Sequence, residues 1–480
     1  MDTKKLPQKI LDLAIRGKLV PQDPNDEPAS VLLERIRAEK ERLIKEGKIK
    51  RSKKTTSDTP HYENRQVGEA NETPFEVPEG WEWTTINDIC SKIGSGSTPR
   101  GSNYAKEGIP FFRSQNVYND GLVYDDIKYI SEEVHENMIG TEVRAKDLLL
   151  NITGGSLGRC AIVPDEFQKG NVSQHVCILR TIIVLPAYLH LFIISDYFAA
   201  TMILSGSGRE GLPKYSLETM QFPLPPHEEQ FRIVTTVDKW FTLIDTLESA
   251  KEDLQMSIAQ AKSKILDLAI HGKLLPQDPN DEPAIELLKR INPKFTPCDN
   301  AHYKNVPSNW IVCKVKEVFR INPKTKADDD MKAGFVPMSN IQDSFKNSMS
   351  FEPKTWGSIK KGYTHFEDGD IAVAKISPCL ENRKSAVIVG LPNGIGAGTT
   401  ELNVFRSDYI HPLYGLFFFK SDYFISQCVG TFNGVVGQQR VSTKIIEDMV
   451  FPVPPRPEQE RIINKVNELF QILDNISVEL

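Results

Sequence analysis

A segment of 27 residues occurs twice in this chain of 480 residues. Ile10–Ile36 and Ile265–Ile291 are identical at 22 of the 27 positions. A second pair of similar segments, Phe222–Val234 and Phe451–Ile463, lies 229 residues apart. The long stretches between these repeats barely resemble each other. Internal repetition of this kind decides the architecture before any local pattern does, and here it predicts one duplicated frame that presents two different inserts.

The frame contains long helices with a narrow apolar seam. After Pro226, apolar residues recur at alternating steps of four and three, which is the 3.5-residue period of a coiled coil, with a break at Lys251. These positions are Ile233, Val237, Trp240, Ile244, Leu247, Leu254, Ile258, Ala261, Ile265 and Leu268. The end of the chain repeats the register at Ile462, Val466, Leu469, Leu473, Ile476 and Leu480. Gly17 and Gly272 follow the repeated segment ILDLAI and are typical helix stops.

The offsets between the repeats predict how these helices pair. We expect the C-terminal helix to run antiparallel to the central helix, and the N-terminal helix to complete the same arm. The arrangement would be a circular pseudo-two-fold, with both termini near the middle of a coil. The seam from Ile233 to Leu268 would then be about 54 Å long at 1.5 Å per residue. The alternative is that the helices only hold the chain together or join two copies of it.

The two inserts have the composition of α+β domains. Each opens with a matching turn, Val77–Trp83 or Val306–Val312, and closes on a Phe-Pro-x-Pro-Pro hinge. Short apolar runs separated by Gly, Asn and Ser predict strands; they are Ile109–Val117, Asp147–Ile152, Cys160–Val163, His175–Arg180, Phe335–Ile341, Asp370–Ile376, Ser385–Val389 and Leu402–Arg406. Pro186–Leu204 and His411–Val429 are helical stretches dense enough in apolar residues to pack on a sheet.

These patterns divide the chain into six segments. Their predicted boundaries are 1–36 for an N-terminal repeat, 37–74 for a basic linker, 75–221 for the first insert, 222–302 for the central repeat with the long helix, 303–450 for the second insert, and 451–480 for the C-terminal helix.

Composition places the chain among ordinary soluble proteins. Hydrophobic residues make up 40% and charged residues 25%, and no apolar run reaches the roughly 18 residues of a membrane span. Seven cysteines stand far apart without a CxxC pair, which favours free thiols in a reducing cytoplasm. The net charge of −6 argues against indiscriminate binding of nucleic acid, so any DNA affinity must come from local patches or from a partner.

No catalytic pattern is present. A Walker A sequence is missing, and so is the Asn/Asp-Pro-Pro-aromatic tetrapeptide by which amino-group methyltransferases hold a flipped base. The nine histidines show no zinc-ligand spacing with cysteine, so we expect no metal site. The chain is therefore predicted to have no catalytic residues of its own.

What the inserts offer instead is polar loops suited to base edges. Arginine pairs well with guanine, and Asn or Gln with adenine, in the major groove. The candidate DNA-binding residues are Arg100, Arg113, Gln115, Asn116, Asn151, Arg209 and Lys214 in the first insert, and Asn340, Lys375, Arg383, Gln438, Gln439 and Arg440 in the second. The competing interpretation is that they are ordinary surface polar residues. The basic run Arg35–Lys54 is more typical of a solvated helix and tether than of a groove reader.

Taken together, the chain resembles the specificity subunit of type I restriction–modification systems. The resemblance rests on the hinge-to-helix segments Leu224–Ile233 and Val453–Ile462, on the segments Leu11–Gln22 and Leu266–Gln277, and on GSTPRGSNYAKEGIPFFRSQNV and DLLLNITGGSLGRCAIVP in the first insert. It implies two target-recognition domains that each read one half of a bipartite, asymmetric double-stranded DNA site. The helices would set the unread spacer.

The resemblance also implies partners. Two adenine methyltransferase (modification) subunits would dock on the frame and bring in the restriction translocase, while S-adenosylmethionine and ATP would be bound by those partners. The repeated PQDPNDEP segment is polar, so we expect it to supply identical docking surfaces, with the residues Lys18, Gln22, Asp23, Asn25, Asp26, Lys273, Gln277, Asp278, Asn280 and Asp281. Two alternatives stay open: a specificity subunit of a combined restriction–methylation enzyme without a separate translocase, and a coiled-coil adaptor that binds no DNA.

Overall fold

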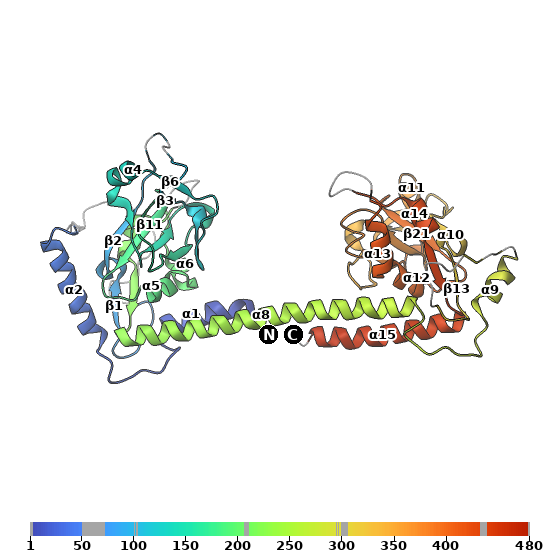
Figure 1. Cartoon of the computed structure of the whole chain (residues 1–480), viewed down its shortest axis with the longest axis horizontal. Coiled ribbons are helices and arrows are strands. Elements are labelled where there is room, and N and C mark those ends of the chain that lie inside the picture. The colour runs from blue at the N-terminus through green and yellow to red at the C-terminus, as the bar shows by residue number, and fades with distance from the viewer. Residues whose placement is uncertain are drawn as a thin grey trace. The chain divides into compact units, whose positions relative to one another are not determined.

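The fold consists of two compact units that share one long helix. A computed structural model describes residues 3–49, 73–99, 101, 104–205, 211–293, 295, 297–298, 306–432 and 439–478. The units are Met1–Ser249 and Ala250–Leu480. Helix α8, His227–Ile270, has 44 residues and passes through the boundary between them (Figure 1). Each unit is described by itself below.

Among its described residues, the first unit contains two four-stranded sheets and two two-stranded ones, of which one is the pair β4-β5. The first sheet has the order β2-β11-β8-β9, the second β6-β3-β10-β7, and β1 pairs with β12. In the described part of this unit, β3 and β10 are the only parallel neighbours. The strands are β1 Glu82–Thr85, β2 Cys90–Ser95, β3 Ile109–Phe112, β4 Val117–Tyr118, β5 Gly121–Leu122, β6 Lys128–Ile130, β7 Glu142–Val143, β8 Leu148–Asn151, β9 Cys160–Ile162, β10 Gly170–Val172, β11 Val176–Thr181 and β12 Gln221–Leu224.

The second unit repeats the strand order of both four-stranded sheets and of the β1-β12 pair, whereas the β4-β5 pair has no counterpart among its described strands. Its sheets have the orders β14-β21-β18-β19 and β16-β15-β20-β17, with β13 paired to β22 and with β15 and β20 as the parallel neighbours. The strands are β13 Ile311–Lys314, β14 Arg320–Ile321, β15 Lys332–Val336, β16 Glu352–Thr355, β17 Thr364–Glu367, β18 Ile371–Ala374, β19 Ser385–Val387, β20 Ile395–Gly398, β21 Leu402–Arg406 and β22 Val450–Val453. The predicted α+β class with two repeated domains is confirmed.

The central strands are apolar on both faces because each is covered on both. In β8, Leu148 and Leu150 belong to the core shared with the helices, while Leu149 belongs to the core between the two sheets. In β18, Ile371 and Val373 face the helices in the same way. A side-chain period of two with both faces buried produces a continuous apolar run, and that run made these strands predictable.

Helices cover the outer face of the first sheet in each unit. The segments predicted as helical between Pro186 and Leu204, and between His411 and Val429, are each divided into two helices by a serine. Ser195 and Ser421 both accept a hydrogen bond from the backbone N–H three residues later, at 3.2 Å, which is the geometry of an N-cap. The helices of the domains are α3 Ile86–Ile89, α4 Glu132–Asn137, α5 Pro186–Ile193, α6 Asp196–Thr201, α7 Lys214–Thr219, α10 Val315–Val318, α11 Trp356–Ile359, α12 Pro412–Phe419, α13 Asp422–Val429 and α14 Thr443–Asp448.

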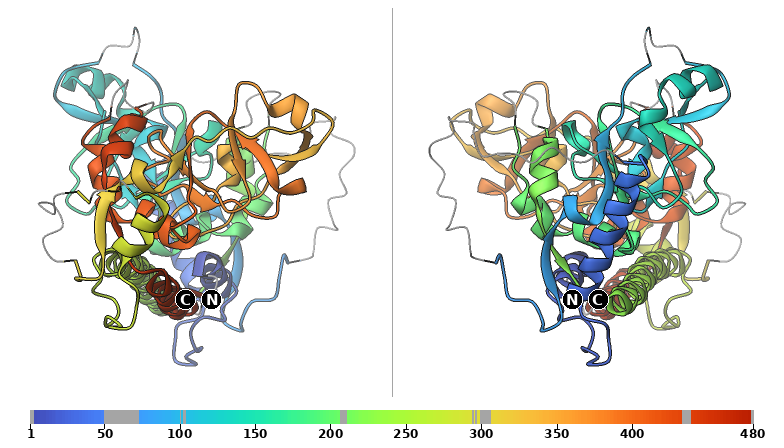
Figure 2. Two further views of the ribbon diagram at one scale, coloured as in Figure 1. Left: turned by 90° about the vertical axis from the view of Figure 1, so that its right-hand side faces the viewer. Right: turned by 90° about the vertical axis from the view of Figure 1, so that its left-hand side faces the viewer.

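Each unit has its own antiparallel helix pair. In the first, α1 (Leu6–Ile15) lies along the first part of α8, since Thr3 bonds to Glu248 while Gln22, beyond the other end of α1, bonds to Glu229. In the second, α15 (Arg456–Val478) lies beside the last part of α8, as the views in Figure 2 show. There Lys262 pairs with Asp474. The antiparallel pairing predicted for the frame is thus present within both units.

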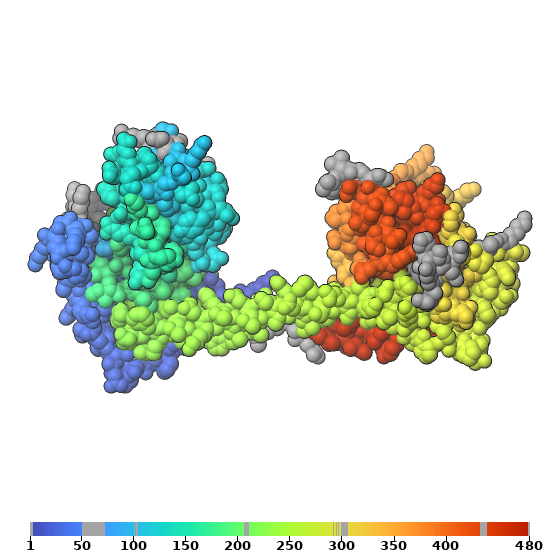
Figure 3. All heavy atoms as spheres, in the orientation of Figure 1, coloured from blue at the N-terminus to red at the C-terminus, as the bar shows by residue number. Residues whose placement is uncertain are grey.

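The apolar seam of α8 is less continuous than the 3.5-residue spacing suggests. Ile233 and Val237 are fully buried, but Trp240 and Leu247 are 46% and 47% exposed. The ten residues of α1 form only about three turns, so they cover a limited stretch of α8. In Figure 3 much of α8 is open to solvent on the face shown.

Two further helices follow the repeated loops. Helix α2 spans Ala29–Lys45 and α9 spans Ala284–Ile291. The predicted linker 37–74 therefore begins inside a helix, and its residues 50–72 lie outside the described part of the chain. All seven cysteines are free, and five of them are buried. Within the described residues, no helix is both long and apolar enough to cross a membrane.

Candidate nucleic-acid interface

In the first unit, four polar loops meet at one end of the sheet that contains β8. Asn151 ends that strand, and its Nδ2 donates to the backbone oxygen of Ser114 at 2.8 Å. The backbone N–H of Ile152 donates to the oxygen of His175 at 3.0 Å, and Thr153 forms a bridge with Gly211. The structure thus brings together three stretches that contain predicted site residues.

The candidates in the first of these loops differ in their exposure. Asn116 is fully buried and donates to the backbone oxygens of Val123 and Asp125, so it shapes the loop. Gln115 is exposed, and both it and Arg113 donate to Asp126. Asn151 is fully buried as well, and its Oδ1 has no hydrogen-bond partner among the described residues.

Of the remaining candidates of the first domain, the structure describes Lys214. Lys214 is 61% exposed and pairs with Glu218 in helix α7. Arg100 and Arg209 lie outside the described residues, as does Gln438 of the second domain.

The equivalent loops meet in the second unit. The backbone N–H of Lys375 donates to the oxygen of Glu401, and the N–H of Ser377 to the oxygen of Gln439. Arg440 holds Glu401 through two hydrogen bonds of 2.8 Å from Nε and Nη2. The structure therefore collects Lys375, Gln439 and Arg440, three of the predicted residues, at one place.

Two candidates of the second domain have other neighbours. Asn340 is half-buried, and its Oδ1 accepts from Ser339. Arg383 has a side chain only 16% exposed, and its guanidinium pairs with Asp422 and lies 4.9 Å above the ring of Phe345.

Equivalent positions of the two loop clusters carry different chemistry. The bridge from Thr153 to Gly211 in the first domain corresponds to the bridge from Ile376 to Arg440 in the second. In the same way, His175 occupies the place of Glu401. The backbone oxygen of each accepts from the N–H of the residue that directly follows β8 or β18. A glycine and a histidine are thus replaced by an arginine and a glutamate on the same backbone plan. Such loops can recognise different ligands while they keep the same fold.

The base of each unit contains a buried glutamate that sequence reasoning missed. Glu229 of α8 is 1% exposed and accepts from Trp81 Nε1 at 2.9 Å and from Gln22 Nε2 at 2.7 Å. Burial raises the pKa of this carboxyl, although the two donors oppose the rise. Glu458 of α15 repeats the arrangement with Trp310 and Gln277. The retention of Glu-Gln in both copies of the hinge was the available signal.

We call each of these sets of contacts, Glu229 with Trp81 and Gln22 or Glu458 with Trp310 and Gln277, a junction. The repeated PQDPNDEP loop is attached to it. Arg232 forms two hydrogen bonds with Asp26, whose side chain is 9% exposed, and Arg461 does the same with Asp281. These contacts within the chain therefore explain part of the sequence identity between the two loops. The polar composition of the loops did not reveal them. Of the predicted docking residues, those exposed to solvent are Lys18, Gln22, Asp23, Asn25, Lys273 and Asn280, and those half-buried are Asp26, Gln277, Asp278 and Asp281.

Comparison with known proteins places this architecture in a family. Residues 78–256 and 307–480 match the family model described as Type I restriction modification DNA specificity domain. The specificity subunit of the type I restriction enzyme EcoAI from Escherichia coli is 41% identical over 269 residues, which cover 51% of this chain and 46% of that protein. The EcoEI specificity subunit is 38% identical over a similar share. The chain thus spans about half the length of these curated relatives.

Other similarities extend over most of the chain. The EcoKI specificity subunit of Escherichia coli strain K12 is 19% identical over 424 residues, which cover 84% of this chain and 85% of that one. The crystal structure of an HsdS subunit from Thermoanaerobacter tengcongensis has the same fold, with a TM-score of 0.53 and 16% identity over 85% of this chain and 93% of that one. Because the family model covers both halves, this chain belongs to the type I restriction modification DNA specificity family.

Proposed function

We propose that this chain is the DNA-recognition subunit of a type I restriction–modification enzyme, without catalytic residues of its own. Its two recognition domains, residues 75–221 and 303–450, each read one half of a bipartite, asymmetric DNA sequence. The observation that carries this proposal is the pair of loop clusters, which share a backbone plan but differ in side chains at equivalent positions, such as Gly211 and Arg440. Two identical half-sites would need no such difference.

We further propose that two methyltransferase subunits dock on the repeated junction loops, and that the restriction translocase joins through them. The exposed residues Lys18 and Asn25 have identical counterparts, Lys273 and Asn280, on the same local backbone. S-adenosylmethionine and ATP would be bound by the partners. The net charge of −6 supports this division, because the partners would supply many of the phosphate contacts.

Exchange of one recognition domain tests the assignment of half-sites. Residues 75–221 are replaced by those of a relative with another specificity, the methyltransferase partner is added, and methylated sites are mapped on genomic DNA. The expected result is a site in which one half is new and the other half is retained. Alteration of both halves would contradict the proposal.

Dependence on the partner is tested separately. We expect weak binding of DNA by the chain alone, and specific binding once the methyltransferase is present. Incubation of the chain alone with labelled S-adenosylmethionine and DNA should transfer no label. Methyl transfer by the isolated chain would show instead that it carries an active site.

A further inference from the structure

In the first unit, one glutamine of the frame connects α1 to the recognition domain. Gln8 Nε2 donates to the backbone oxygen of Ile194, at the end of α5, at 3.1 Å. Its Oε1 accepts from the backbone N–H of Asp196, the first residue of α6, at 2.9 Å. A single side chain thus provides hydrogen-bond partners for a backbone oxygen at the end of one helix and for a backbone N–H at the start of the next.

In the second unit the equivalent frame residue is too short for this role. Ser263 corresponds to Gln8, because the repeat that begins at Ile265 follows its first copy at Ile10 by the same 255 residues. Among the residues that the structure describes, the Ser263 hydroxyl bonds only to the carboxylate of Asp422, the counterpart of Asp196. The helix-end oxygen, here that of Lys420, receives its hydrogen bond from Arg383 of the recognition domain itself.

The backbone of Arg383 indicates that its side chain is needed there. Arg383 has φ +57°, and Gly158, which stands two residues before the equivalent strand of the first domain, has φ +87°. Residues other than glycine rarely adopt this left-handed backbone conformation, so glycine is the usual residue there. An arginine at a position where the other domain has glycine is explained by the contacts that it makes.

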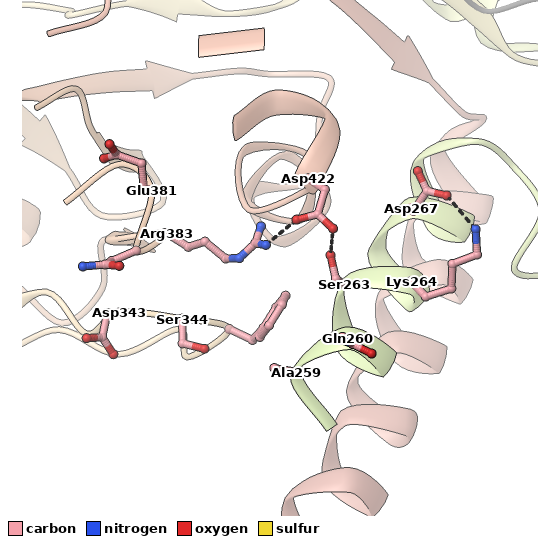
Figure 4. A pocket seen from close by; sticks show the side chains of 12 residues that line it. Ala259, Gln260, Ser263, Lys264, Asp267, Asp343, Ser344, Glu381, Arg383 and Asp422 are labelled. Carbon is pink, nitrogen blue, oxygen red and sulfur yellow. Dashed lines mark hydrogen bonds and ion pairs between the residues drawn. The ribbon is translucent and has the colours of Figure 1, made fainter. Parts of the chain in front are cut away.

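Arg383 also begins a series of contacts that reaches both helices of the pair. Its guanidinium stacks on Phe345, the Phe345 ring lies 5.8 Å from that of Phe470 in α15, and Lys262 of α8 lies 5.2 Å above Phe470. Figure 4 shows Arg383 and Ser263 converging on Asp422, where each donates to a different carboxylate oxygen. Beside them, between α8 and the domain, lies an open hollow of about 750 Å³.

We propose that Arg383 is a positioning residue that docks the second recognition domain on α8 and α15, and that with Asp422 it replaces the role of Gln8. The two domains are therefore attached to nearly identical frames by different side chains. The docking itself does not depend on DNA. Its consequence, correct presentation of the second domain to its half-site, rests on the proposed function.

Three variants of the full chain test the docking. Arg383→Gly removes the side chain and suits φ +57°, so the loop itself is not strained. Ser263→Gln in that background restores the frame residue of the first unit, and the hollow beside Ser263 leaves room for it. Arg320→Ala removes an arginine that is 61% exposed and serves as the control.

Hydrogen exchange measured by mass spectrometry reports on the loops 343–346 and 380–384. Arg383→Gly should accelerate exchange there about tenfold, as expected for the loss of a charge-assisted hydrogen bond. Adding Ser263→Gln should reverse most of that change, and Arg320→Ala should cause none. Unchanged exchange in Arg383→Gly, or failure of Ser263→Gln to slow it, would overturn the proposal.

Binding of DNA in the presence of the methyltransferase shows whether Arg383 positions the domain or contacts DNA directly. It also separates failure of the docking proposal from failure of the proposed function. If Arg383 acts by position, Ser263→Gln restores reading of the second half-site together with slow exchange. If exchange is restored while reading is not, Arg383 touches DNA and the positioning role in reading is rejected. If exchange responds as expected and no form of the chain binds a specific site, the docking stands and the proposed function fails.

Discussion

At the scale of single residues, the buried glutamates of the junctions have the clearest energetic role. Glu229→Ala would leave the buried Nε1–H of Trp81 without its acceptor and would remove the bond from the exposed Gln22. The expected loss is about 1–3 kcal/mol in the free energy of unfolding. Glu458→Ala should have a similar cost, because its partners are equivalent. Urea unfolding measures both, and Glu228→Ala, a neighbour whose side chain is 72% exposed, is the matched control.

A second prediction concerns Lys420, which is 2% exposed and donates from Nζ to the backbone oxygens of Ser344 and Arg383 at 2.8 and 2.7 Å. Burial, together with the nearby Arg383 charge, lowers the pKa of Lys420 to about 7. The folded state therefore disfavours the proton that the unfolded chain still binds up to its ordinary pKa near 10.5. Stability contributed by this group is present in full above pH 10.5 and is lost progressively as the pH falls from there through 7.

Relative to Lys420→Met, the wild type should gain stability as the pH rises from 7 towards 10, by up to about 1.4 kcal/mol per pH unit. Urea unfolding at pH 7, 8 and 9 measures the difference between the two proteins. Parallel curves would show that Lys420 does not change its protonation in this range. Lys361→Met, at an exposed position of the same unit, is the control.

At the scale of elements, the glycines after helices α1 and α2 provide a test that separates the cost of backbone strain from the cost of a steric clash. Gly17 follows α1 with φ +66°, and a Cβ there would lie 2.3 Å from the Pro78 side chain. Gly47 follows α2 with φ +69° and has nothing within 4 Å. Gly47→Ala should cost about 1–2 kcal/mol from the left-handed conformation alone. Gly17→Ala should cost clearly more in unfolding free energy, and equal costs would show that Pro78 moves aside.

The same scale shows how much of the fold was predictable from sequence. Strand β8 and helix α8 follow from local patterns, because burial on two faces and a helical period leave their mark on adjacent residues. Contacts such as that between Gln8 and Asp196, 188 residues apart, leave no local pattern. The sequence around Asn116 likewise gives no sign of its contacts, so it is predicted there as a residue that reads bases. In the structure Asn116 is buried and shapes its own loop. A polar residue in a loop sequence does not reveal whether it points inward or outward.

At the scale of the whole molecule, duplication has consequences for assembly. The two junctions share the same glutamate, tryptophan, glutamine, arginine and aspartate contacts. Two surfaces of the same composition on the same local backbone should bind identical partners with equal affinity, whereas the recognition domains differ. We therefore expect an assembly that is symmetric in its protein contacts and asymmetric in the DNA that it reads.

This expectation can be measured by disabling one docking loop. Mismatched charge in a docking surface opposes association, so Lys18→Glu, which reverses a charge, together with Asn25→Arg, which introduces one, should remove one methyltransferase. Native mass spectrometry should then show one partner per chain instead of two, and the remaining partner should bind with unchanged affinity. The matching pair at Lys273 and Asn280 should give the same ratio, and all four changes together should leave none. Loss of both partners from a change in one loop would contradict independent docking, because it would mean that the partners hold each other in place.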